Sequence, residues 1–399
     1  MWSSALHRVL TQLVQLGELS VTYPDGALRR YGSGRDAPRV AVTLRDADLP
    51  RRIVLSPDMA VGEAYMNATL LIEEDDLYGF LALVIANLAV QHNPPWFRRP
   101  IEFLTYMGRS LAQFNPVPRA RANVAHHYDL SGALYDLFLD EDRQYSCAYF
   151  SDPDMTLEAA QAAKKRHIAA KLLLEPGMHV LDVGCGWGGM ALTLARDYGA
   201  QVLGVTLSTE QHRVAVARAE AAGLADKVRY QLIDYREVTG QFDRIVSVGM
   251  FEHVGLPQFG TYFAALRDRL SSDGVALVHT IGRAKPPGTT SPWIAKYIFP
   301  GGYVPALSEM MRSVENSGLI ATDIEVWRLH YAETLRHWRA RFEAREAEAL
   351  YDARFCRMWR YYLAASELTF RLNRQVVFQV QLSPRQDAVP LTRDYLCNT

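Results

Sequence analysis

The chain has 399 residues, of which 49% are hydrophobic, and this is enough to bury the cores of two or three domains. Its formal net charge of −1 argues against a nucleic-acid partner, because such partners select a strongly basic surface. The four cysteines are scattered and form no CxxC pair. This pattern indicates neither a zinc ribbon nor a dithiol redox site, predicts no metal, and favours a reducing compartment.

The start of the chain has neither the charged region nor the long apolar region of a secretory signal. The longest apolar stretch, FLALVIANLAV at 80–90, is too short to cross a bilayer. These observations predict a soluble protein located in the cytoplasm.

Residues 1–92 alternate short strand-like runs with helical runs, which predicts a small N-terminal α/β domain, and we expect this domain to associate with lipid or membrane. The expected strands are RVAVTLR at 39–45 and RRIVLS at 51–56. The expected helices are LHRVLTQLVQL at 6–16 and DLYGFLALVIANLAV at 76–90.

Residues 93–122 are predicted to be a basic linker with an amphipathic helix at its centre. Apolar side chains recur there at helical spacing, and the stretch carries five arginines against one glutamate. Two interpretations remain open at this stage: a helix packed on a domain, which this stretch alone favours, or a helix lying on an anionic membrane surface. The apolar positions are Ile101, Leu104, Met107, Leu111 and Phe114.

Residues 123–399 show the alternation of apolar strands and helices that is typical of βαβ units. We therefore predict an α/β fold with a Rossmann-like, mostly parallel sheet. Residues 332–375 read as two helical stretches. The expected strands are 179–184, 200–207, 228–234, 243–249, 274–280 and, after the two helices, 376–382.

The stretch VLDVGCGWGG at 180–189 joins a strand to a helix through a glycine-rich turn. Glycines let a ligand approach the backbone, and the helix N-terminus offers free N–H groups, so the turn indicates a nucleotide site. Gly184, Gly186 and Gly189 match the dinucleotide pattern GxGxxG. Binding of NAD, however, also calls for an acidic residue after the second strand, and that strand ends at Thr206.

The same stretch resembles motif I of S-adenosylmethionine-dependent methyltransferases. The resemblance implies that Gly184 and Gly186 line the methionine part of the cofactor, and that Asp234, at the end of the third strand, faces the adenine. It also implies that SVGMFEHVG, at 247–255, forms the floor of the active site.

A longer series of motifs resembles the cyclopropane fatty acid synthases. In chain order they are HYDLSGALYDLFLDEDRQYSCAYF, LDVGCGWGG, VTLSTEQ, GMFEHVG, HTIG, WIAKYIFPGG and FCRMWRYYLAASE. The resemblance covers 93–399 strongly and the N-terminal domain more loosely. One departure is Ser366, which stands where many members carry a cysteine, and it argues against a covalent cysteine mechanism.

The resemblance implies methyl transfer from S-adenosylmethionine to a cis double bond of a phospholipid acyl chain. Ring closure would then follow by loss of a proton to a bound bicarbonate. Aromatic faces would shield the carbocation, with Tyr145, Phe251, Tyr297 and Phe299 as candidates. Bicarbonate ligands are implied at Cys147, Glu252, His279, the Ile281 backbone and Tyr331.

Cofactor contacts are implied by the same resemblance at a second set of positions. They are Tyr128, Tyr145, Ser146, Asp182, Gly184, Gly186, Thr206, Leu207, Gln211, Asp234, Tyr235 and Arg236. Taken singly, Cys147 and His279 would be read as buried core residues, and only the surrounding motifs give them a role. We interpret His253 as structural.

Three alternatives to cyclopropane formation stay open. The chain could be an enzyme of the same family that forms a methyl-branched or methylene product, such as a furan fatty acid precursor. A small-molecule methyltransferase and a non-catalytic lipid-binding protein are the others. The expected partners are membrane phospholipid and an anionic membrane surface, with the protein peripheral on the inner membrane face. A homodimer is an arrangement that the sequence leaves open.

Overall fold

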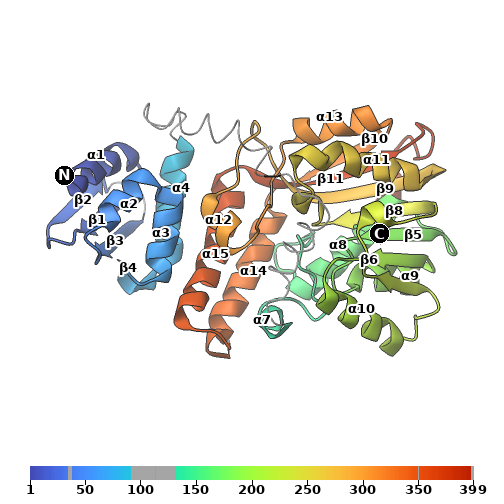
Figure 1. Ribbon diagram of the computed structural model, residues 1–399, viewed down its shortest axis with the longest axis horizontal. Coiled ribbons are helices and arrows are strands. Elements are labelled where there is room, and N and C mark those ends of the chain that lie inside the picture. Colours follow the sequence, from blue (N-terminus) through green and yellow to red (C-terminus); the bar gives the residue numbers. More distant parts are fainter. Residues whose placement is uncertain (35–37, 91–112, 114–131, 349, 397–399) are drawn as a thin grey trace. The chain divides into compact units, whose positions relative to one another are not determined.

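The computed structural model describes the whole chain except residues 35–37, 91–112, 114–131, 349 and 397–399 (Figure 1). The predicted linker, 93–122, and the predicted cofactor residue Tyr128 therefore lie outside the described residues, apart from Gln113. Contacts divide the chain into two units. The first comprises Met1–Thr105, Ser291–Ile298 and Leu335–Arg374, and the second comprises Tyr106–Thr290, Phe299–Thr334 and Gln375–Thr399.

The first unit contains a four-stranded sheet in the order β2-β1-β3-β4, in which β1 and β3 are parallel. The strands are β1 (Glu18–Thr22), β2 (Leu28–Gly32), β3 (Arg39–Leu44) and β4 (Leu70–Ile72). The helices are α1 (Trp2–Leu13), α2 (Leu49–Leu55), α3 (Pro57–Met66), α4 (Leu77–Val90), α12 (Pro292–Tyr297) and α15 (Ala353–Leu372). Leucines, valines and tyrosines from the strands and from α1, α3 and α4 form its core, and Ala364 and Leu368 of α15 complete it.

The expectation of mixed α/β structure in 1–92 is confirmed, but the strand expected at 51–56 is wrong. These residues belong to α2, which starts after Asp48 and carries Pro50 in its first turn. Proline has no N–H for a neighbouring strand, and its fixed φ suits the start of a helix. The expected strand at 39–45 is β3, and the expected helices are α1 and α4.

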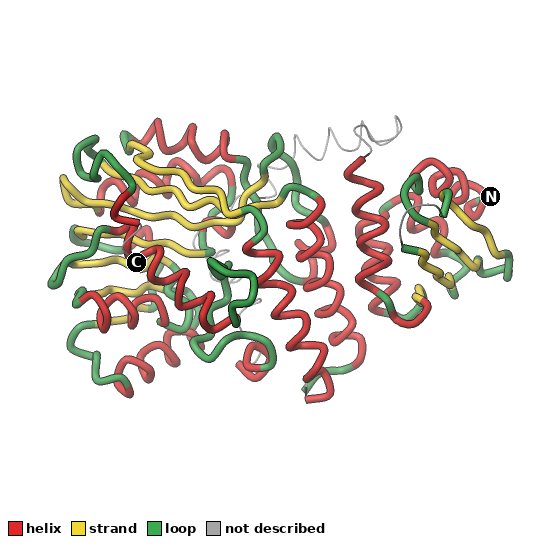
Figure 2. Tube along the Cα trace, turned by 180° about the vertical axis from the view of Figure 1, so that it is seen from behind, coloured by secondary structure: helices red, strands yellow, loops and turns green. Residues whose placement is uncertain are grey.

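The second unit contains a seven-stranded sheet in the order β10-β11-β9-β8-β5-β6-β7 (Figure 2). The five strands from β9 to β7 run parallel, whereas β11 is antiparallel to both β9 and β10. The strands are β5 (His179–Val183), β6 (Gln201–Val205), β7 (Val228–Gln231), β8 (Phe242–Val248), β9 (Leu270–Arg283), β10 (Ile320–Trp327) and β11 (Gln375–Ser383). The predicted mostly parallel sheet is confirmed, and β10 is a strand that the sequence patterns did not predict.

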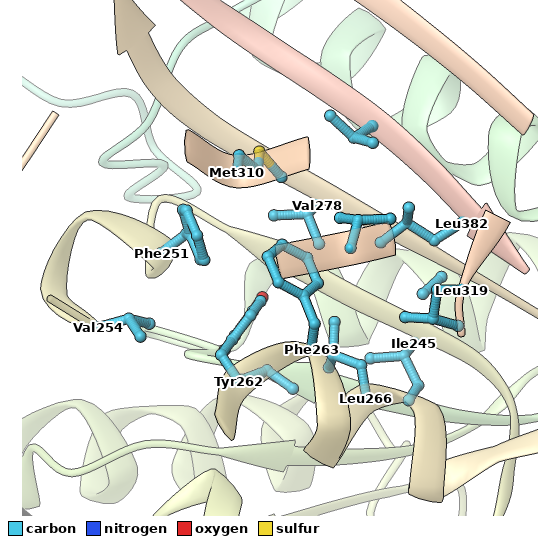
Figure 3. Packing of buried hydrophobic residues seen from close by; sticks show 14 of the residues in the cluster. Ile245, Phe251, Val254, Tyr262, Phe263, Leu266, Val278, Met310, Leu319 and Leu382 are labelled. Carbon is cyan, nitrogen blue, oxygen red and sulfur yellow. The ribbon is translucent and has the colours of Figure 1, made fainter. Parts of the chain in front are cut away.

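Helices cover both faces of this sheet, because successive strand residues point to opposite sides. Val180, Val246 and Leu277 pack with α8, α9 and α10, while their neighbours Leu181, Ile245 and Val278 pack with α11 and α13 (Figure 3). The helices are α7 (Gly132–Asp136), α8 (Leu157–Leu172), α9 (Gly189–Tyr198), α10 (Thr209–Ala221), α11 (Phe259–Arg269) and α13 (Leu307–Ser317). A further helix, α14 (His330–Arg345), starts in the second unit and continues into the first.

No described helix combines the length and the apolar character that a membrane span requires.

Candidate active site

A cavity opens at the carboxyl ends of β5, β6, β7 and β8, where open α/β sheets bind their ligands. Loops after these strands and the segment 143–146 line it. Every predicted cofactor residue that the structure describes is on its wall: Tyr145, Ser146, Asp182, Gly184, Gly186, Thr206, Leu207, Gln211, Asp234, Tyr235 and Arg236. The predicted cofactor residues therefore come from four separate segments of the chain and lie on the wall of one cavity.

The glycine turn after β5 provides a cradle in which a ligand can approach the backbone. Gly184 has φ +79°, and a Cβ there would lie 2.8 Å from the Met250 side chain. Gly186 has φ +54°, and a Cβ there would meet nothing within 4 Å, so it would project into open space in the cavity. The turn leads directly into α9, whose first N–H groups are unpaired by the geometry of a helix start.

Asp182 lies at the bottom of the same cavity and is almost fully buried. Its Oδ2 atom has no hydrogen-bond partner among the described residues. Burial raises the pKa of this carboxyl to about 7. A buried acceptor without a partner is unusual in a native protein. It fits a ligand that brings a hydrogen-bond donor, such as the ammonium group of S-adenosylmethionine.

The next two strand ends carry polar side chains of different kinds. After β6, the Thr206 hydroxyl donates to Gln211 Oε1 at 2.9 Å, so no carboxylate stands where a dinucleotide ribose would need one. After β7, the buried carboxylate of Asp234 accepts from Arg236 Nε and Nη2, both at 2.7 Å. These contacts keep both side chains ordered at the cavity wall.

The segment before Cys147 forms the remaining wall. Tyr145 packs edge-on against Tyr135, with 5.3 Å between the ring centroids, and this aromatic contact fixes the position of its ring. Gln161 and Lys164 of α8 hold the neighbouring residues Gln144 and Ser146 by four hydrogen bonds. Neither α8 residue was singled out from the sequence.

A signal for Lys164 does exist in the sequence. Ala160, Lys164 and Ile168 follow one another at spacings of four, which places the lysine on the apolar face of a helix. In the structure all three are completely buried.

Glu252 and Ile281, two of the predicted bicarbonate positions, are in direct contact. Glu252 Oε1 accepts from the Ile281 backbone N–H at 2.6 Å, and so this N–H is already occupied by the protein. Glu252 Oε2 is buried and has no partner among the described residues. Burial raises the pKa of the Glu252 carboxyl to about 7. Glu252 directly precedes His253, which lies on the cavity wall.

His279, a third predicted position, is buried in the middle of β9. Gln379 Nε2 lies 3.1 Å from its Nδ1 atom, and Trp327 packs edge-on at 5.1 Å. The Gln379 amide therefore holds one nitrogen of the imidazole ring by a hydrogen bond. Burial lowers the pKa of His279 well below its ordinary value, which keeps the imidazole neutral.

Cys147 directly follows Ser146 of the cavity wall and is completely buried. Its Sγ atom lies 3.3 Å from the Ala148 carbonyl oxygen, to which the thiol donates. Burial strongly raises the pKa of this thiol. The side chain is therefore a neutral thiol and a poor nucleophile.

Tyr331, the fifth position, lies in the first turn of α14 and is 8% exposed. The same turn is tied to the Cys147 segment. The Ala148 N–H donates to Thr334 Oγ1 at 3.0 Å, and the Phe150 N–H donates to His330 Nδ1 at 3.1 Å. The fold thus brings the two elements that carry Cys147 and Tyr331 together.

The candidate cation-shielding rings separate into different environments. Tyr145 lies on the cavity wall, and Phe299 packs edge-on at 5.8 Å against His253, which lines the cavity. Phe251, by contrast, packs in the hydrophobic core (Figure 3), where its ring centroid lies 4.3 Å from that of Phe259. Its shielding role stays a prediction. Tyr297 belongs to the first unit, where its hydroxyl donates to Glu63.

His253, which we interpreted as structural from the sequence, lies on the cavity wall. Burial lowers its pKa to about 4, so the ring presents a neutral surface there.

The sheet order, the glycine turn and the cavity at the strand ends together define a class I methyltransferase that uses S-adenosylmethionine. Residues 117–380 match the family model described as mycolic acid cyclopropane synthetase, and 5–90 match one described as a domain of unknown function. The chain belongs to the mycolic acid cyclopropane synthetase family, and it is a methyltransferase of the cyclopropane-fatty-acyl-phospholipid synthase type.

Three known proteins illustrate the similarity. The cyclopropane-fatty-acyl-phospholipid synthase of Escherichia coli K12 is 39% identical over 344 residues, which are 86% of this chain and 87% of that protein. A probable fatty acid methyltransferase of Pseudomonas putida is 45% identical over 257 residues, covering 62% of this chain and 65% of the relative. The crystal structure of the mycolic acid cyclopropane synthase CmaA1 with SAH and CTAB has a TM-score of 0.63 at 34% identity, over 68% of this chain and 99% of that one.

Proposed function

We propose that this enzyme converts the cis double bond of an unsaturated phospholipid acyl chain into a cyclopropane ring. The methylene carbon would come from S-adenosylmethionine, and bicarbonate would be the base. The observation that carries the proposal is the buried Glu252 carboxyl, whose Oε2 atom has no partner among the described residues beside the cofactor cavity. An acceptor in that state suits the O–H group of a bicarbonate ion.

When bound, S-adenosylmethionine supplies an electrophilic methyl group, which a poorly nucleophilic alkene requires. The protein's own task is to hold the two reactants in line and to exclude water. Tyr145 and Phe299 offer aromatic faces that stabilise positive charge without adding a nucleophile. The neutral thiol of Cys147 likewise adds no competing thiolate.

The second bound group, bicarbonate, would supply the base that accepts the proton. His279 is neutral and carries one ring N–H, and Tyr331 carries a phenolic O–H, so each side chain has a hydrogen to donate. Glu252 is the acceptor of the set. Neutral donors hold an anion without quenching its basicity, which a buried lysine or arginine in direct contact would do.

A methyl-branched or methylene product is the second candidate. The same cation can lose a proton from a different carbon, and the similarity to a probable fatty acid methyltransferase supports this reading. The distinction depends on where the proton acceptor lies relative to the new methyl group.

The deciding experiment is mass spectrometry of lipids from a host that lacks cyclopropane lipids and expresses this chain. We expect phospholipid acyl chains that gain one CH2 unit and resist mild hydrogenation. Products that take up hydrogen would establish the branched alternative, and unchanged lipids would contradict both.

Two variants test the base itself. Glu252→Gln and His279→Ala should each lower turnover by roughly 10²- to 10⁴-fold, because a single positioned acid or base contributes about that much. Binding of S-adenosylhomocysteine, measured by calorimetry, should stay close to that of the unaltered enzyme. Turnover at the normal rate in both variants would remove bicarbonate from the proposal.

A further inference from the structure

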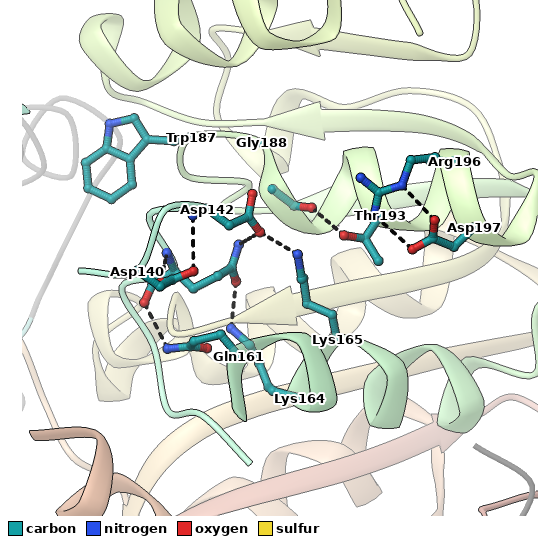
Figure 4. Close-up of polar contacts among 12 residues, drawn as sticks. Asp140, Asp142, Gln161, Lys164, Lys165, Trp187, Gly188, Thr193, Arg196 and Asp197 are labelled. Carbon is teal, nitrogen blue, oxygen red and sulfur yellow. Dashed lines mark hydrogen bonds and ion pairs between the residues drawn. The ribbon is translucent and has the colours of Figure 1, made fainter. Parts of the chain in front are cut away.

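Helix α8 holds the cavity segment through two side chains one turn apart. Gln161 Nε2 donates to the backbone oxygens of Gln144 at 3.1 Å and Ser146 at 3.0 Å. Lys164 Nζ donates to the side chains of the same two residues, to Gln144 Oε1 at 2.6 Å and Ser146 Oγ at 2.8 Å. Figure 4 shows Gln161 and Lys164 projecting from α8 toward this segment. Four hydrogen bonds from one helix face thus fix two alternate residues of the wall.

Lys164 differs from the other buried lysine of α8 in its partners. Both side chains are fully buried. Lys171 forms ion pairs with Asp323 at 3.2 Å and Glu325 at 2.6 Å. Within the described part of the chain, Lys164 makes hydrogen bonds to neutral groups but no ion pair. Asp140 and Asp182 act on Lys164 electrostatically without forming an ion pair with it, so the buried ammonium group depends on these neutral hydrogen-bond acceptors.

The contact with Lys164 also determines what the Ser146 hydroxyl can do. A hydroxyl has one hydrogen to donate and two lone pairs to accept with, whereas an ammonium group only donates. Lys164 therefore occupies a lone pair of Ser146 Oγ and leaves the serine hydrogen for another acceptor. Ser146 lies on the cavity wall, so that acceptor would be a ligand in the cavity.

We infer that Lys164 is a positioning residue which, through Ser146, makes this wall a subsite for the carboxylate of the cofactor's amino-acid end. Asp182 lines the same cavity with an unpartnered Oδ2 atom and would receive the ammonium group of that end. Ser146 and Asp182 together would bind the two charged groups of a zwitterionic α-amino acid. The inference rests on the cofactor in the proposed function and does not depend on the lipid product.

Charged and titratable groups surround Lys164 on every side. Burial lowers the pKa of Lys164 to about 8 and raises that of Asp182 to about 7, and the positive charge of Lys164 opposes the rise at Asp182. The groups that face Lys164 are Asp140, Asp142 and Cys147 of the wall segment, Lys165 of α8, Asp182 of β5 and His279 of β9.

The sign of the pH dependence follows from these shifts. A ligand carboxylate favours charged Lys164, so affinity falls as pH rises through about 8. A ligand ammonium favours ionised Asp182, so affinity falls as pH drops through about 7. Affinity should therefore be highest between the two values. The ligand's own titration is common to all variants, and differences between variants isolate the protein groups.

The test is calorimetric binding of S-adenosylhomocysteine to the full chain across this pH range, without lipid. At neutral pH, Lys164→Met should weaken binding about 10-fold or more, the usual effect of losing a hydrogen bond that involves a charged group. It should also abolish the loss of affinity above pH 8, whereas Asp182→Asn should abolish the loss below pH 7. Lys171→Met is the matched control, and its affinity and pH profile should equal those of the unaltered chain.

A double-variant comparison asks whether Lys164 acts through Ser146. Ser146→Ala should weaken binding to a similar degree, and Lys164→Met combined with Ser146→Ala should be no weaker than the poorer single variant. The inference would be overturned if the losses of affinity in the two single variants added up in the double variant. It would also be overturned if Lys164→Met still lost affinity above pH 8. If Lys164→Met does not fold, Ser146→Ala decides alone. Normal affinity in Ser146→Ala, with the same loss of affinity above pH 8 as in the unaltered chain, would overturn the inference. Because the assay contains no lipid, none of these outcomes bears on ring formation.

Discussion

At the scale of single residues, the glycine turn after β5 gives the most specific prediction about cofactor binding. Gly186 combines φ +54° with empty space where a Cβ would lie, on the wall of the cavity. In Gly186→Val the side chain would fill the position of the ligand, so we predict that binding of S-adenosylhomocysteine is lost in calorimetry. The left-handed backbone should also lower the free energy of unfolding by about 1–3 kcal/mol.

Gly223 provides a matched control for that backbone effect. It has φ +65° with nothing within 4 Å of a Cβ, and it is exposed just beyond α10. Gly223→Val should lose a similar amount of stability and bind the ligand normally. Normal binding in Gly186→Val, in contrast, would refute the assignment of the turn to the cofactor.

Glu252 leads to a prediction about stability as well as catalysis. Its pKa is raised from the ordinary value of 4.5 to about 7 by burial, so between these pH values the folded state holds a proton that the unfolded state has lost. The free energy of unfolding should therefore fall as pH rises from about 4.5 to about 7. One pKa unit corresponds to about 1.4 kcal/mol, which places the total contribution near 3 kcal/mol.

The variant Glu252→Gln isolates this contribution, because glutamine does not titrate. Urea unfolding of both proteins at several pH values should show the variant gaining stability relative to the unaltered enzyme across that window. A difference that stays constant with pH would mean that the carboxyl is hydrated, and the argument for its unpartnered oxygen would then fail.

At the scale of elements, α8 connects the cavity wall to the far edge of the sheet. Besides holding the segment 144–146, it carries Lys171, which is fully buried between Asp323 and Glu325 of β10. We predict that Lys171→Met lowers the free energy of unfolding by about 1–3 kcal/mol, because it removes a buried charged hydrogen-bond donor while Asp323 keeps Arg393 and Glu325 keeps His167 as partners.

The exposed pair Arg196–Asp197 is the appropriate comparison, since its side chains are 62% and 42% exposed. Arg196→Met should change stability by less than about 1 kcal/mol. Equal effects of the two substitutions in urea unfolding would show that the α8–β10 contact is solvated and does not brace the sheet.

At the scale of the whole molecule, the proposed phospholipid substrate would require the enzyme to reach an acyl chain that lies inside a bilayer. Residues 96–121, nearly all outside the described residues, interleave Trp96 and Phe97 with several arginines. We propose that this segment docks on an anionic surface, where each basic residue contributes about 1 kcal/mol. Changing Arg98, Arg99 and Arg109 together to Gln should reduce sedimentation with anionic liposomes and turnover on them.

Activity of this triple variant on detergent-dispersed lipid should survive, and the liposome binding of the unaltered enzyme should weaken with salt. A control variant with the same loss of charge, Arg196→Gln, Arg213→Gln and Arg229→Gln, should bind liposomes normally, since these arginines are exposed on the second unit. If both triple variants bind equally well at low salt, docking lies elsewhere on the protein.

The sequence by itself determined the features that depend on a few neighbouring residues. Strands β5 to β9 and β11, the glycine turn and the polar strand ends were all readable, because backbone conformation and apolar alternation are local properties. The strand expected at 51–56 failed for the same kind of reason, since a local proline signal outweighed the apolar run. Motif resemblance then placed the cofactor residues on strand ends that parallel strands bring to one edge.

Only the tertiary structure decided which distant side chains meet and what their surroundings do to them. Glu252 and Ile281 are 29 residues apart, and His279 and Gln379 are 100 apart, so their contacts depend on the order and register of β8, β9 and β11. Burial, which keeps His279 neutral and places the Lys164 ammonium group among neutral hydrogen-bond acceptors, exists only once the helices cover the sheet. Phe251 likewise belongs to the core because α11 packs against it, and its neighbours in the sequence do not predict that contact.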